Sequence, residues 1–209
     1  MENKEGIAKK KRLGIYGGTF SPPHIGHEHA ARAFLDHGSI DALTVIPTFV
    51  TPLKERAEQT SPDDRLAMCR LAFSFSDRIT VSDIEIRREG RSYTAETLKA
   101  LSAPNTHLSF LCGTDMFLTI DKWYMPELIF KFARVVCMRR EDAEENAKLL
   151  SEKAALYRER FAADIDFISV PPLVLSSSEI RERLKNNKSA EDLLSPAVLS
   201  YIREKGLYI

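Results

Sequence analysis

The sequence predicts an α/β fold in which a doubly wound, mainly parallel sheet carries helices on both faces. Short apolar runs bounded by Gly, Pro or Asp alternate along the chain with segments whose apolar residues have helical spacing. Runs such as LTVIP (43–47) and RVVCM (134–138) are apolar on both faces, which suits parallel strands buried between two helix layers. In such a fold ligands bind at the carboxyl ends of the strands, so the residues that follow the strands are candidates for a functional site.

The apolar runs and the segments between them give the expected elements in order. The first run, LGIYGG, ends in two glycines and the second, ALTVIP, ends in proline, and these residues mark the turns that follow strands. The predicted strands are 13–18, 42–47, 79–86, 107–113, 134–138 and 164–170. The predicted helices are 27–35, 62–73, 94–101, 141–161, 178–184 and 196–205.

The length of the chain favours one domain. A chain of 209 residues is long enough for one full core, and no linker, repeat or low-complexity segment divides it. We therefore expect residues 13–209 to form a single domain. Residues 1–12 are polar and basic, and they are expected to form a flexible N-terminal tail.

Charge, cysteine content and apolar content exclude several classes of protein. Lys plus Arg and Asp plus Glu are both 30, so a net charge of zero argues against a surface for nucleic acid. Cys69, Cys112 and Cys137 lie far apart in apolar surroundings without a CxxC pair, so buried reduced thiols are expected. No apolar run approaches the roughly 20 residues of a membrane span or resembles a signal peptide. We expect no membrane contact and a cytoplasmic location.

The loop after the first predicted strand has the features of a phosphate site. Gly17 and Gly18 let a phosphate approach the backbone, and a helix that begins near the following histidines points its free N–H groups at that phosphate. His24 and His27 are three residues apart, so they can share one face of the turn and donate ring N–H groups to phosphate oxygens. A tight turn that the histidines cap is the alternative interpretation.

A second candidate element follows the last predicted strand. Ser176, Ser177 and Ser178 stand just before a helical segment with Glu179 in its first turn, which is typical of N-caps. Capping does not explain Arg181, whose guanidinium would lie at the same end of the sheet as the first loop. We predict that this helix start and Arg181 hold the β- and γ-phosphates of a nucleotide.

Together the two elements resemble the nucleotidyltransferase superfamily that is marked by an HxGH loop and a late SSSxIR-type segment. The chain is similar to bacterial nicotinate-nucleotide adenylyltransferases from about Leu13 to Ile209. The segments that carry this similarity, beyond the two loops, are IPTFVTPLKER (46–56), DDRLAMCRLAF (63–73), DIEIRREGRSYTAETL (83–98), FLCGTDMFLTIDKWY (110–124) and LSPAVLSYIREKGLYI (194–209). The GRSYTAETL and GTD…W blocks separate this family from its relatives better than the HxGH loop does.

The resemblance implies a Rossmann-like nucleotidyltransferase fold and a reaction in NAD biosynthesis. Members of the family transfer the adenylyl group of ATP to nicotinate mononucleotide, and the products are deamido-NAD and pyrophosphate. The implied substrates are therefore two small molecules. Whether the chain forms a homo-oligomer is left open by its sequence.

The resemblance also implies roles for single residues. Trp123, the only tryptophan, is implied to stack on the pyridine ring, whereas a core anchor is the usual role of so large a side chain. Tyr93 and Thr94 are implied to present donors to the nicotinate carboxylate, although Thr94 alone would be a helix cap. Lys54 is implied to contact the phosphate of the mononucleotide, whereas a solvated surface position is the default for any lysine.

The residues assigned to ATP come partly from the two loops and partly from the resemblance. Gly113 and Asp115, just past the fourth predicted strand, are implied to approach the ribose or adenosine, with an N-cap as the other interpretation of Asp115. The complete set is Gly17, Gly18, Thr19, Phe20, His24, His27, Gly113, Asp115, Ser176, Ser177, Ile180 and Arg181.

This chain departs from the family pattern at two places. Family members usually have Asp where this chain has Ser21, and a PPHK stretch where this chain has TPLK (51–54). Ser21 can hydrogen-bond locally but supplies no carboxylate. Leu53 removes a phosphate donor just before Lys54.

The implied reaction is an attack by the phosphate of the mononucleotide on the α-phosphorus of ATP. Because this nucleophile is already ionised, catalysis depends on positioning two anions and on stabilising charge, with no strong base. The expected catalytic residues are His24, His27, Lys54 and Arg181. Mg²⁺ is expected to enter with ATP, held mainly by substrate oxygens and water rather than by a dedicated protein site.

Other functions are compatible with parts of the sequence. A sister adenylyltransferase would act on nicotinamide mononucleotide or on phosphopantetheine, although the SYT and DKW segments favour a pyridine ring. A class I aminoacyl-tRNA synthetase shares the HIGH string, but this chain lacks the length, a KMSKS-like segment and an anticodon domain. A non-catalytic nucleotide sensor that kept the fold would bind ATP without turnover.

Overall fold

The protein is built around one twisted parallel sheet. The computed structural model describes residues 10–52, 60–140, 144–171 and 175–208. In this part of the chain, six strands lie in the order β3-β2-β1-β4-β5-β6, and every neighbouring pair is parallel. The strands are β1 (Lys11–Gly18), β2 (Ala42–Pro47), β3 (Ile79–Val81), β4 (Thr106–Gly113), β5 (Ala133–Arg140) and β6 (Ile165–Val170). The predicted doubly wound parallel fold is confirmed.

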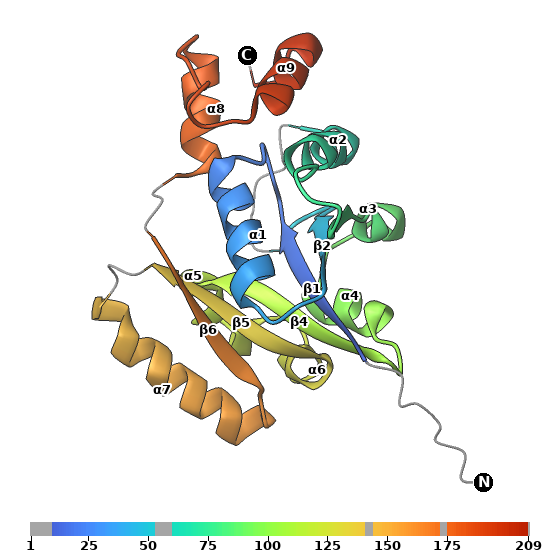
Figure 1. The fold of residues 1–209 in the computed structure, drawn as a ribbon, viewed down its shortest axis with the longest axis vertical. Helices are drawn as coiled ribbons and strands as arrows, with labels where there is room; N and C mark the ends of the chain where they lie inside the picture. Colours follow the sequence, from blue (N-terminus) through green and yellow to red (C-terminus); the bar gives the residue numbers. More distant parts are fainter. Residues whose placement is uncertain (1–9, 53–59, 141–143, 172–174, 209) are drawn as a thin grey trace, which may run out of the picture.

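Helices cover both faces of the sheet (Figure 1). They are α1 (Ile25–His37), α2 (Pro62–Ala72), α3 (Ile84–Arg88), α4 (Thr94–Leu101), α5 (Thr114–Phe117), the 3-10 turn η1 (Ile120–Lys122), α6 (Pro126–Phe132), α7 (Glu144–Phe161), α8 (Ser177–Lys185) and α9 (Pro196–Lys205). One core packs α1, α2 and α9 on the sheet, and the other packs α4, α6 and α7 on its opposite face. Successive residues of β4 alternate between these cores, as the pleat of a strand requires.

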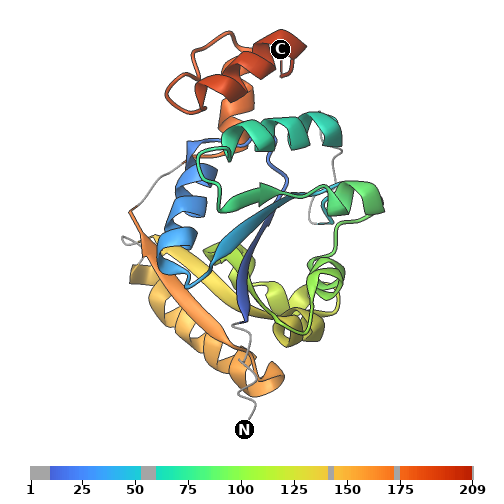
Figure 2. The ribbon, with the colours of Figure 1, turned by 45° about the vertical axis from the view of Figure 1, so that its right-hand side comes forward.

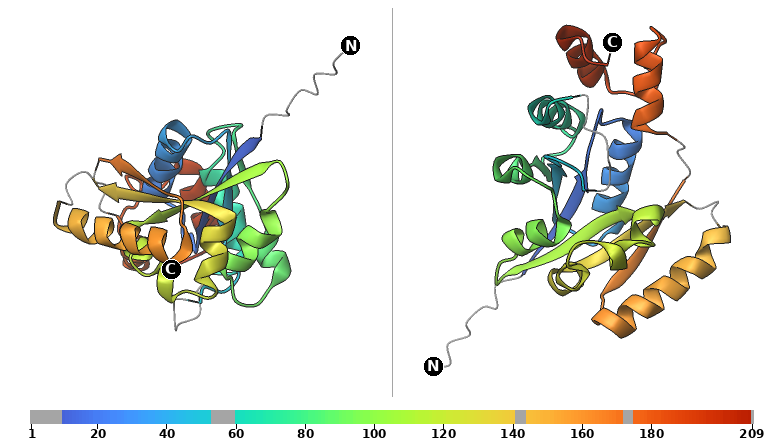
Figure 3. Two further views of the ribbon diagram at one scale, coloured as in Figure 1. Left: turned by 90° about the horizontal axis from the view of Figure 1, so that it is seen from below. Right: turned by 180° about the vertical axis from the view of Figure 1, so that it is seen from behind.

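The C-terminal helices lie over the carboxyl ends of the strands. Helices α8 and α9 lie beyond the carboxyl ends of β1 and β2, where β1 leads into α1 (Figures 1 and 2). The view from behind in Figure 3 shows α4 and α6 on the face opposite to α1. No helix in the described ranges is both long enough and apolar enough to cross a membrane.

The sequence mispredicts some elements near their ends. Of the expected tail 1–12, residues 1–9 lie outside the described ranges, while Lys11 and Arg12 already belong to β1 and pair with β4. The predicted strand 79–86 is wrong after Val81, because residues 84–88 form helix α3. An i,i+4 ion pair between Arg87 and Asp83, with Nε 2.9 Å from Oδ1, supports that helix. The predicted helix 141–161 is seen from residue 144 onward.

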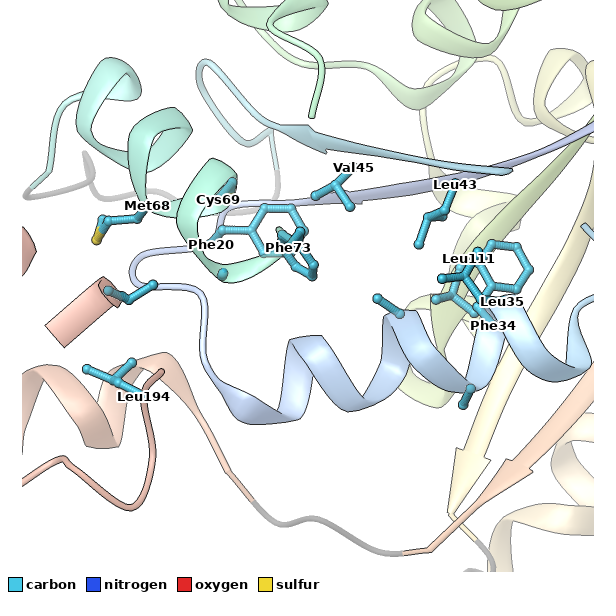
Figure 4. Close-up of a cluster of buried hydrophobic side chains, with 14 of the residues drawn as sticks. Phe20, Phe34, Leu35, Leu43, Val45, Met68, Cys69, Phe73, Leu111 and Leu194 are labelled. Atoms are coloured by element: carbon cyan, nitrogen blue, oxygen red, sulfur yellow. The ribbon is translucent and has the colours of Figure 1, made fainter. Parts of the chain in front are cut away.

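Helix α1 packs against β1 at a glycine. Phe34 of α1 is fully buried in the cluster that Figure 4 shows beside Leu35, Leu43 and Leu111. A Cβ atom added to Gly14 would meet Ile40 Cδ1 and would lie 2.8 Å from Phe34 Cε1. The absence of a side chain at Gly14 thus lets α1 approach the sheet closely.

We expect Gly14→Ala to lower the free energy of unfolding by about 1–3 kcal/mol, because the new methyl group overpacks this contact. Gly17→Ala is the matched control in the same strand, since a Cβ there meets no atom within 4 Å. Urea unfolding of both variants measures the difference. Equal stability of the two variants would contradict the close approach of α1 at Gly14.

Candidate functional site

The candidate site lies where the strand order changes direction. The chain moves outward from β1 through β2 to β3, and then returns to the other side of β1 to add β4, β5 and β6. Strands β1 and β4 are neighbours in the sheet, but the loops that follow them lead to opposite faces. The carboxyl ends of these two strands therefore flank the point at which the loops separate. The predicted phosphate loop follows β1 at this point.

His24 and His27 lie face to face at the start of α1. His24 is the N-cap residue with an extended backbone, and its N–H donates to His27 Nδ1 at 3.2 Å. The ring centroids are 3.7 Å apart and the ring planes differ by 30°. Because Nδ1 of His27 accepts a hydrogen bond, its neutral ring carries the proton on Nε2. That Nε2–H group remains a donor for a ligand.

Both imidazoles are neutral at pH 7. His24 is only 5% exposed, and this burial lowers its pKa to about 4. Burial, and then the neighbouring His24, lower the pKa of His27 well below its usual value. The pair therefore offers neutral N–H donors to an anion, and positive charge has to come from other side chains.

The loop between β1 and α1 is strained and anchored by an aromatic ring. Phe20 has φ of 51°, in the left-handed region that favours glycine, while its ring is 2% exposed. The ring packs edge-on against Tyr16 and Phe73, with centroids 5.3 and 5.7 Å away (Figure 4 shows Phe20 and Phe73). It also lies 5.0 Å from the ring of His27. Contact of Phe20 with ATP would thus involve its backbone.

Arg65 of α2, which was not among the predicted site residues, holds this loop through hydrogen bonds. The side chain is fully buried, and it donates from Nη1 to Thr19 O at 2.9 Å and from Nη2 to Phe49 O at 3.0 Å. It therefore joins the segments that follow β1 and β2. A signal was present, since Arg65 shares one helical face with the buried residues Met68 and Cys69.

The start of α8 docks on the same loop. Arg181 donates from Nη1 to Ser21 O at 2.7 Å and from Nη2 to Ser178 Oγ at 3.0 Å. Ser177 Oγ donates to Pro22 O at 3.0 Å. The two bonds from Arg181 use two of the five N–H groups of its guanidinium, so Arg181 keeps donors for a phosphate.

The two predicted elements thus lie together at one end of the sheet. Ser176 is the N-cap of α8, and its Oγ accepts from the N–H of Glu179 at 3.2 Å, as the capping interpretation predicts. Ile180 is fully buried, so it can contribute only backbone groups to a ligand.

A pocket of about 290 Å³ opens on the β2 side of the loop. Gly17 and Gly18 line it from the end of β1, and Thr19 lines it from the loop that follows. Tyr93 and Thr94 line it from the start of α4, and Trp123 from the segment after η1. The indole of Trp123 packs edge-on against Phe110 at 6.3 Å and donates from Nε1 to Thr119 Oγ1 at 3.2 Å. Tyr93 stacks on Tyr124 with centroids 4.3 Å apart.

Glu85, a further residue that the sequence analysis missed, fixes one wall of this first pocket. It is 5% exposed, and its Oε1 accepts from Thr97 Oγ1 at 2.6 Å. Burial raises its pKa, against the lowering effect of hydrogen bonds from Thr97 and Ser92. Because Thr97 belongs to α4, this bond sets the position of Tyr93 and Thr94 at the start of that helix. The wrong strand prediction for 79–86 concealed it.

A second pocket, of about 430 Å³, lies on the α1 side of the loop. Gly26 and His29 of α1 line it, as do Gly113 at the end of β4 and Asp115 of α5. Met116 lines both pockets, so the two hollows adjoin at the end of β4. Of the predicted residues, Gly17, Gly18, Thr19, Tyr93, Thr94 and Trp123 line the first hollow, and Gly113 and Asp115 line the second. The others within the described ranges line neither hollow and belong to the loop after β1 and to the first turns of α1 and α8: Phe20, His24, His27, Ser176, Ser177, Ile180 and Arg181.

Sequence relatives cover nearly all of the chain. The family of cytidylyltransferase-like proteins matches residues 15–183. A "Probable nicotinate-nucleotide adenylyltransferase" from Lachnoclostridium phytofermentans is 33% identical over 201 residues, which are 95% of this chain and 100% of the relative. A relative of the same name from Synechococcus sp. strain JA-2-3B'a(2-13) is 36% identical over 96% of this chain and 98% of its own length. The chain belongs to the nicotinate-nucleotide adenylyltransferase family.

Solved structures of the same family share this fold. Plasmodium falciparum nicotinic acid mononucleotide adenylyltransferase complexed with NaAD superposes with a TM-score of 0.77 at 23% identity, covering 95% of this chain and 97% of that one. The same Plasmodium protein complexed with APC gives a TM-score of 0.74 over the same shares of the two chains. The predicted Rossmann-like nucleotidyltransferase fold is confirmed.

The departures from the adenylyltransferase family pattern have different outcomes. Leu53 and Lys54 lie outside the described residues. Ser21, where the family usually has Asp, is 2% exposed, and its Oγ lies 3.2 Å from Tyr208 Oη. A neutral hydrogen bond to the C-terminal segment therefore occupies the place of the missing carboxylate.

The lowered histidine pKa predicts how stability depends on pH. Below about pH 6.5 the unfolded chain protonates His24, whereas the folded protein keeps this ring neutral down to about pH 4. The unfolded state then binds more protons, so the free energy of unfolding falls as the pH decreases through this window. We expect His24→Gln to remove on the order of 1–2 kcal/mol of that loss between pH 7 and pH 5.

Urea unfolding at a series of pH values measures this effect. His37→Gln, at the exposed opposite end of α1, is the control for the loss of an imidazole. A His24→Gln profile that runs parallel to those of the wild type and the control would show that the buried ring carries no such cost.

Proposed function

We propose that the chain transfers the adenylyl group of ATP to nicotinate mononucleotide, with residues 13–209 acting as one catalytic unit. The products are deamido-NAD and pyrophosphate. The observation that carries the proposal is the pair of adjoining pockets on either side of the loop with His24 and His27. Relatives over the full length of the chain bear the name of this activity.

The first pocket suits the mononucleotide. Trp123 offers a flat aromatic face to a pyridine ring, and Phe110 and Thr119 hold the indole in place. Helix α4 begins at Thr94, so its first N–H groups, which have no intrahelical partner, are available to the nicotinate carboxylate. We assign Tyr93, Thr94 and Trp123 to this substrate, together with Lys54.

The second pocket suits the adenosine of ATP. Gly113 has no atom within 4 Å of the place where a Cβ would stand, so a ribose can approach the backbone there. Asp115 offers a carboxylate to the sugar hydroxyls or the base. The triphosphate then extends toward Gly17, Gly18 and the start of α1.

The reacting phosphates meet between the pockets. A phosphate oxygen of the mononucleotide attacks the α-phosphorus of ATP, a new P–O–P bridge forms, and the bond to the β-phosphate oxygen breaks as pyrophosphate leaves. His24 and His27 donate N–H groups to the phosphate oxygens, and Arg181 supplies positive charge to the leaving pyrophosphate. Lys54 is proposed to contribute a further positive charge to the reaction. Positioning of the two anions is the main contribution of the protein.

We propose that Mg²⁺ accompanies ATP. The second pocket offers one carboxylate, Asp115, and the described residues contain no group of three His, Cys, Asp or Glu that could hold a metal ion. This donor set fits an ion held mainly by phosphate oxygens and water. When bound, Mg²⁺ neutralises part of the charge on the triphosphate.

Release of pyrophosphate tests the proposed function. The assay contains ATP and Mg²⁺ and compares nicotinate mononucleotide, nicotinamide mononucleotide and phosphopantetheine. We expect the highest kcat/KM with the nicotinate form, and His24→Ala to reduce kcat about 100-fold or more because a donor to the transition state is lost. His37→Ala is the control at the other end of α1. Preference for another acceptor would reassign the substrate, and ATP binding without turnover would favour a sensor.

Trp123→Ala tests the assignment of the first pocket. We expect the KM for nicotinate mononucleotide to rise about 10-fold, because a stacked aromatic ring contributes about 1 kcal/mol beyond the area that it buries. The KM for ATP should stay within about twofold, since Trp123 does not line the second pocket. Steady-state kinetics with each substrate varied in turn measures both constants. An equal rise in both would indicate a general packing role instead.

A further inference from the structure

A buried polar cluster joins the segment that carries Trp123 to helix α7. Asp121 lies in η1, two residues before Trp123. Lys153 Nζ of α7 donates to Asp121 Oδ2 at 3.0 Å. The Tyr157 hydroxyl of the same helix lies 2.9 Å from Asp121 Oδ1 and 2.8 Å from Phe117 O, and it shares its proton between these acceptors. None of these polar groups has a part in the proposed chemistry.

The cluster is too buried to be an incidental surface contact. Tyr157 is fully buried, and the side chains of Asp121 and Lys153 are 13% and 22% exposed. Desolvation is the largest single effect on the pKa of Asp121 and raises it, but the hydrogen bonds from Lys153 and Tyr157 and the charge of Lys153 together bring this pKa below its ordinary value. Removing one partner from such a pair leaves an uncompensated charge, which costs far more than losing an exposed pair.

Short local contacts transmit the position of Asp121 to the indole. Trp123 N donates to Ile120 O at 3.0 Å, so the turn that contains Asp121 also fixes the backbone of Trp123. Ile120 is fully buried, and the indole Nε1 bonds to Thr119 on the same turn. Immediately after Trp123, Tyr124 and Met125 are exposed. The turn before Trp123 therefore restrains the indole, together with the edge-on contact to Phe110 and the stacking of Tyr124 on Tyr93.

We propose that Asp121, Lys153 and Tyr157 form a positioning clamp that holds Trp123 against the first pocket. The clamp sets the affinity for the pyridine nucleotide from a helix that lines neither pocket. The identity of that nucleotide rests on the proposed function, whereas the effect of the clamp on the position of Trp123 does not depend on it.

Trp123 is the only tryptophan of the chain, so intrinsic fluorescence reports on this residue alone. Lys153→Met removes the charge and keeps the apolar stem. We expect acrylamide to quench the variant about twofold more strongly, and the KM for nicotinate mononucleotide to rise about five- to tenfold with little change in kcat or in the KM for ATP. Lys148→Met on the same helix is the matched control, because Lys148 is 88% exposed in its pair with Glu152.

A rescue variant separates positioning from simple loss of stability. The double variant Asp121→Asn, Lys153→Met removes both charges, so no buried carboxylate is left unpaired. Its stability should return toward the wild-type value, whereas quenching should stay raised because the bond from Lys153 is still missing. Tyr157→Phe keeps the packed ring and removes only the hydroxyl, and it provides the same quenching test if Lys153→Met does not fold. Circular dichroism and thermal unfolding establish which variants are folded.

The outcomes distinguish the clamp from the proposed function. Unchanged acrylamide quenching in folded Lys153→Met or Tyr157→Phe would overturn the clamp. If the wild type shows no turnover and no change of Trp123 fluorescence with nicotinate mononucleotide, the proposed function fails, while the acrylamide comparison still decides whether the clamp exists.

Discussion

The geometry of the site depends on the backbone carbonyl groups of the loop after β1. This loop leaves the sheet at a sharp turn, and its carbonyl oxygens cannot join a strand ladder or a helix. Buried carbonyl groups need donors, and here Arg65 supplies one to Thr19, Arg181 one to Ser21, and Ser177 one to Pro22. Segments that are more than a hundred residues apart in the sequence are thus required to hold a single loop.

This arrangement also divides the electrostatic tasks of the site. The two histidines are buried enough to stay neutral, so in the proposed reaction they donate to phosphate oxygens without bringing charge into the core. The guanidinium of Arg181 lies at the edge of the loop, where it is partly solvated, so the positive charge of the site stands outside the core. A chain with no net charge can therefore still present a local site for two anionic substrates.

Much of the fold could be predicted because its signals are local. The run 42–47 is apolar except for Thr44, and it is a central strand flanked on both sides. The segment 79–86 misled because the apolar residues Ile84 and Ile86 follow soon after Val81, while the helix that replaces the strand depends on an ion pair and on the burial of Glu85. A short apolar run cannot by itself distinguish strand from helix.

The site was predictable as motifs but not as contacts. The two loops and the residues around Trp123 were marked by residue types that suit phosphates and aromatic ligands. No residue type marked the partners of Ser21 and Asp121, because Tyr208 and Lys153 are far away in the sequence and only the packed structure brings them near. Arg65 was overlooked for a related reason, since an arginine in a helix is normally expected at the surface.

Met116 of α5 borders both hollows just after β4. A methionine side chain is flexible and adapts its shape to its neighbours. A rotamer that enlarges one hollow takes space from the other, so occupancy of either hollow changes the free energy of filling its neighbour. Such a coupling is reciprocal by thermodynamic necessity, which makes the two affinities properties of the pair rather than of each pocket alone.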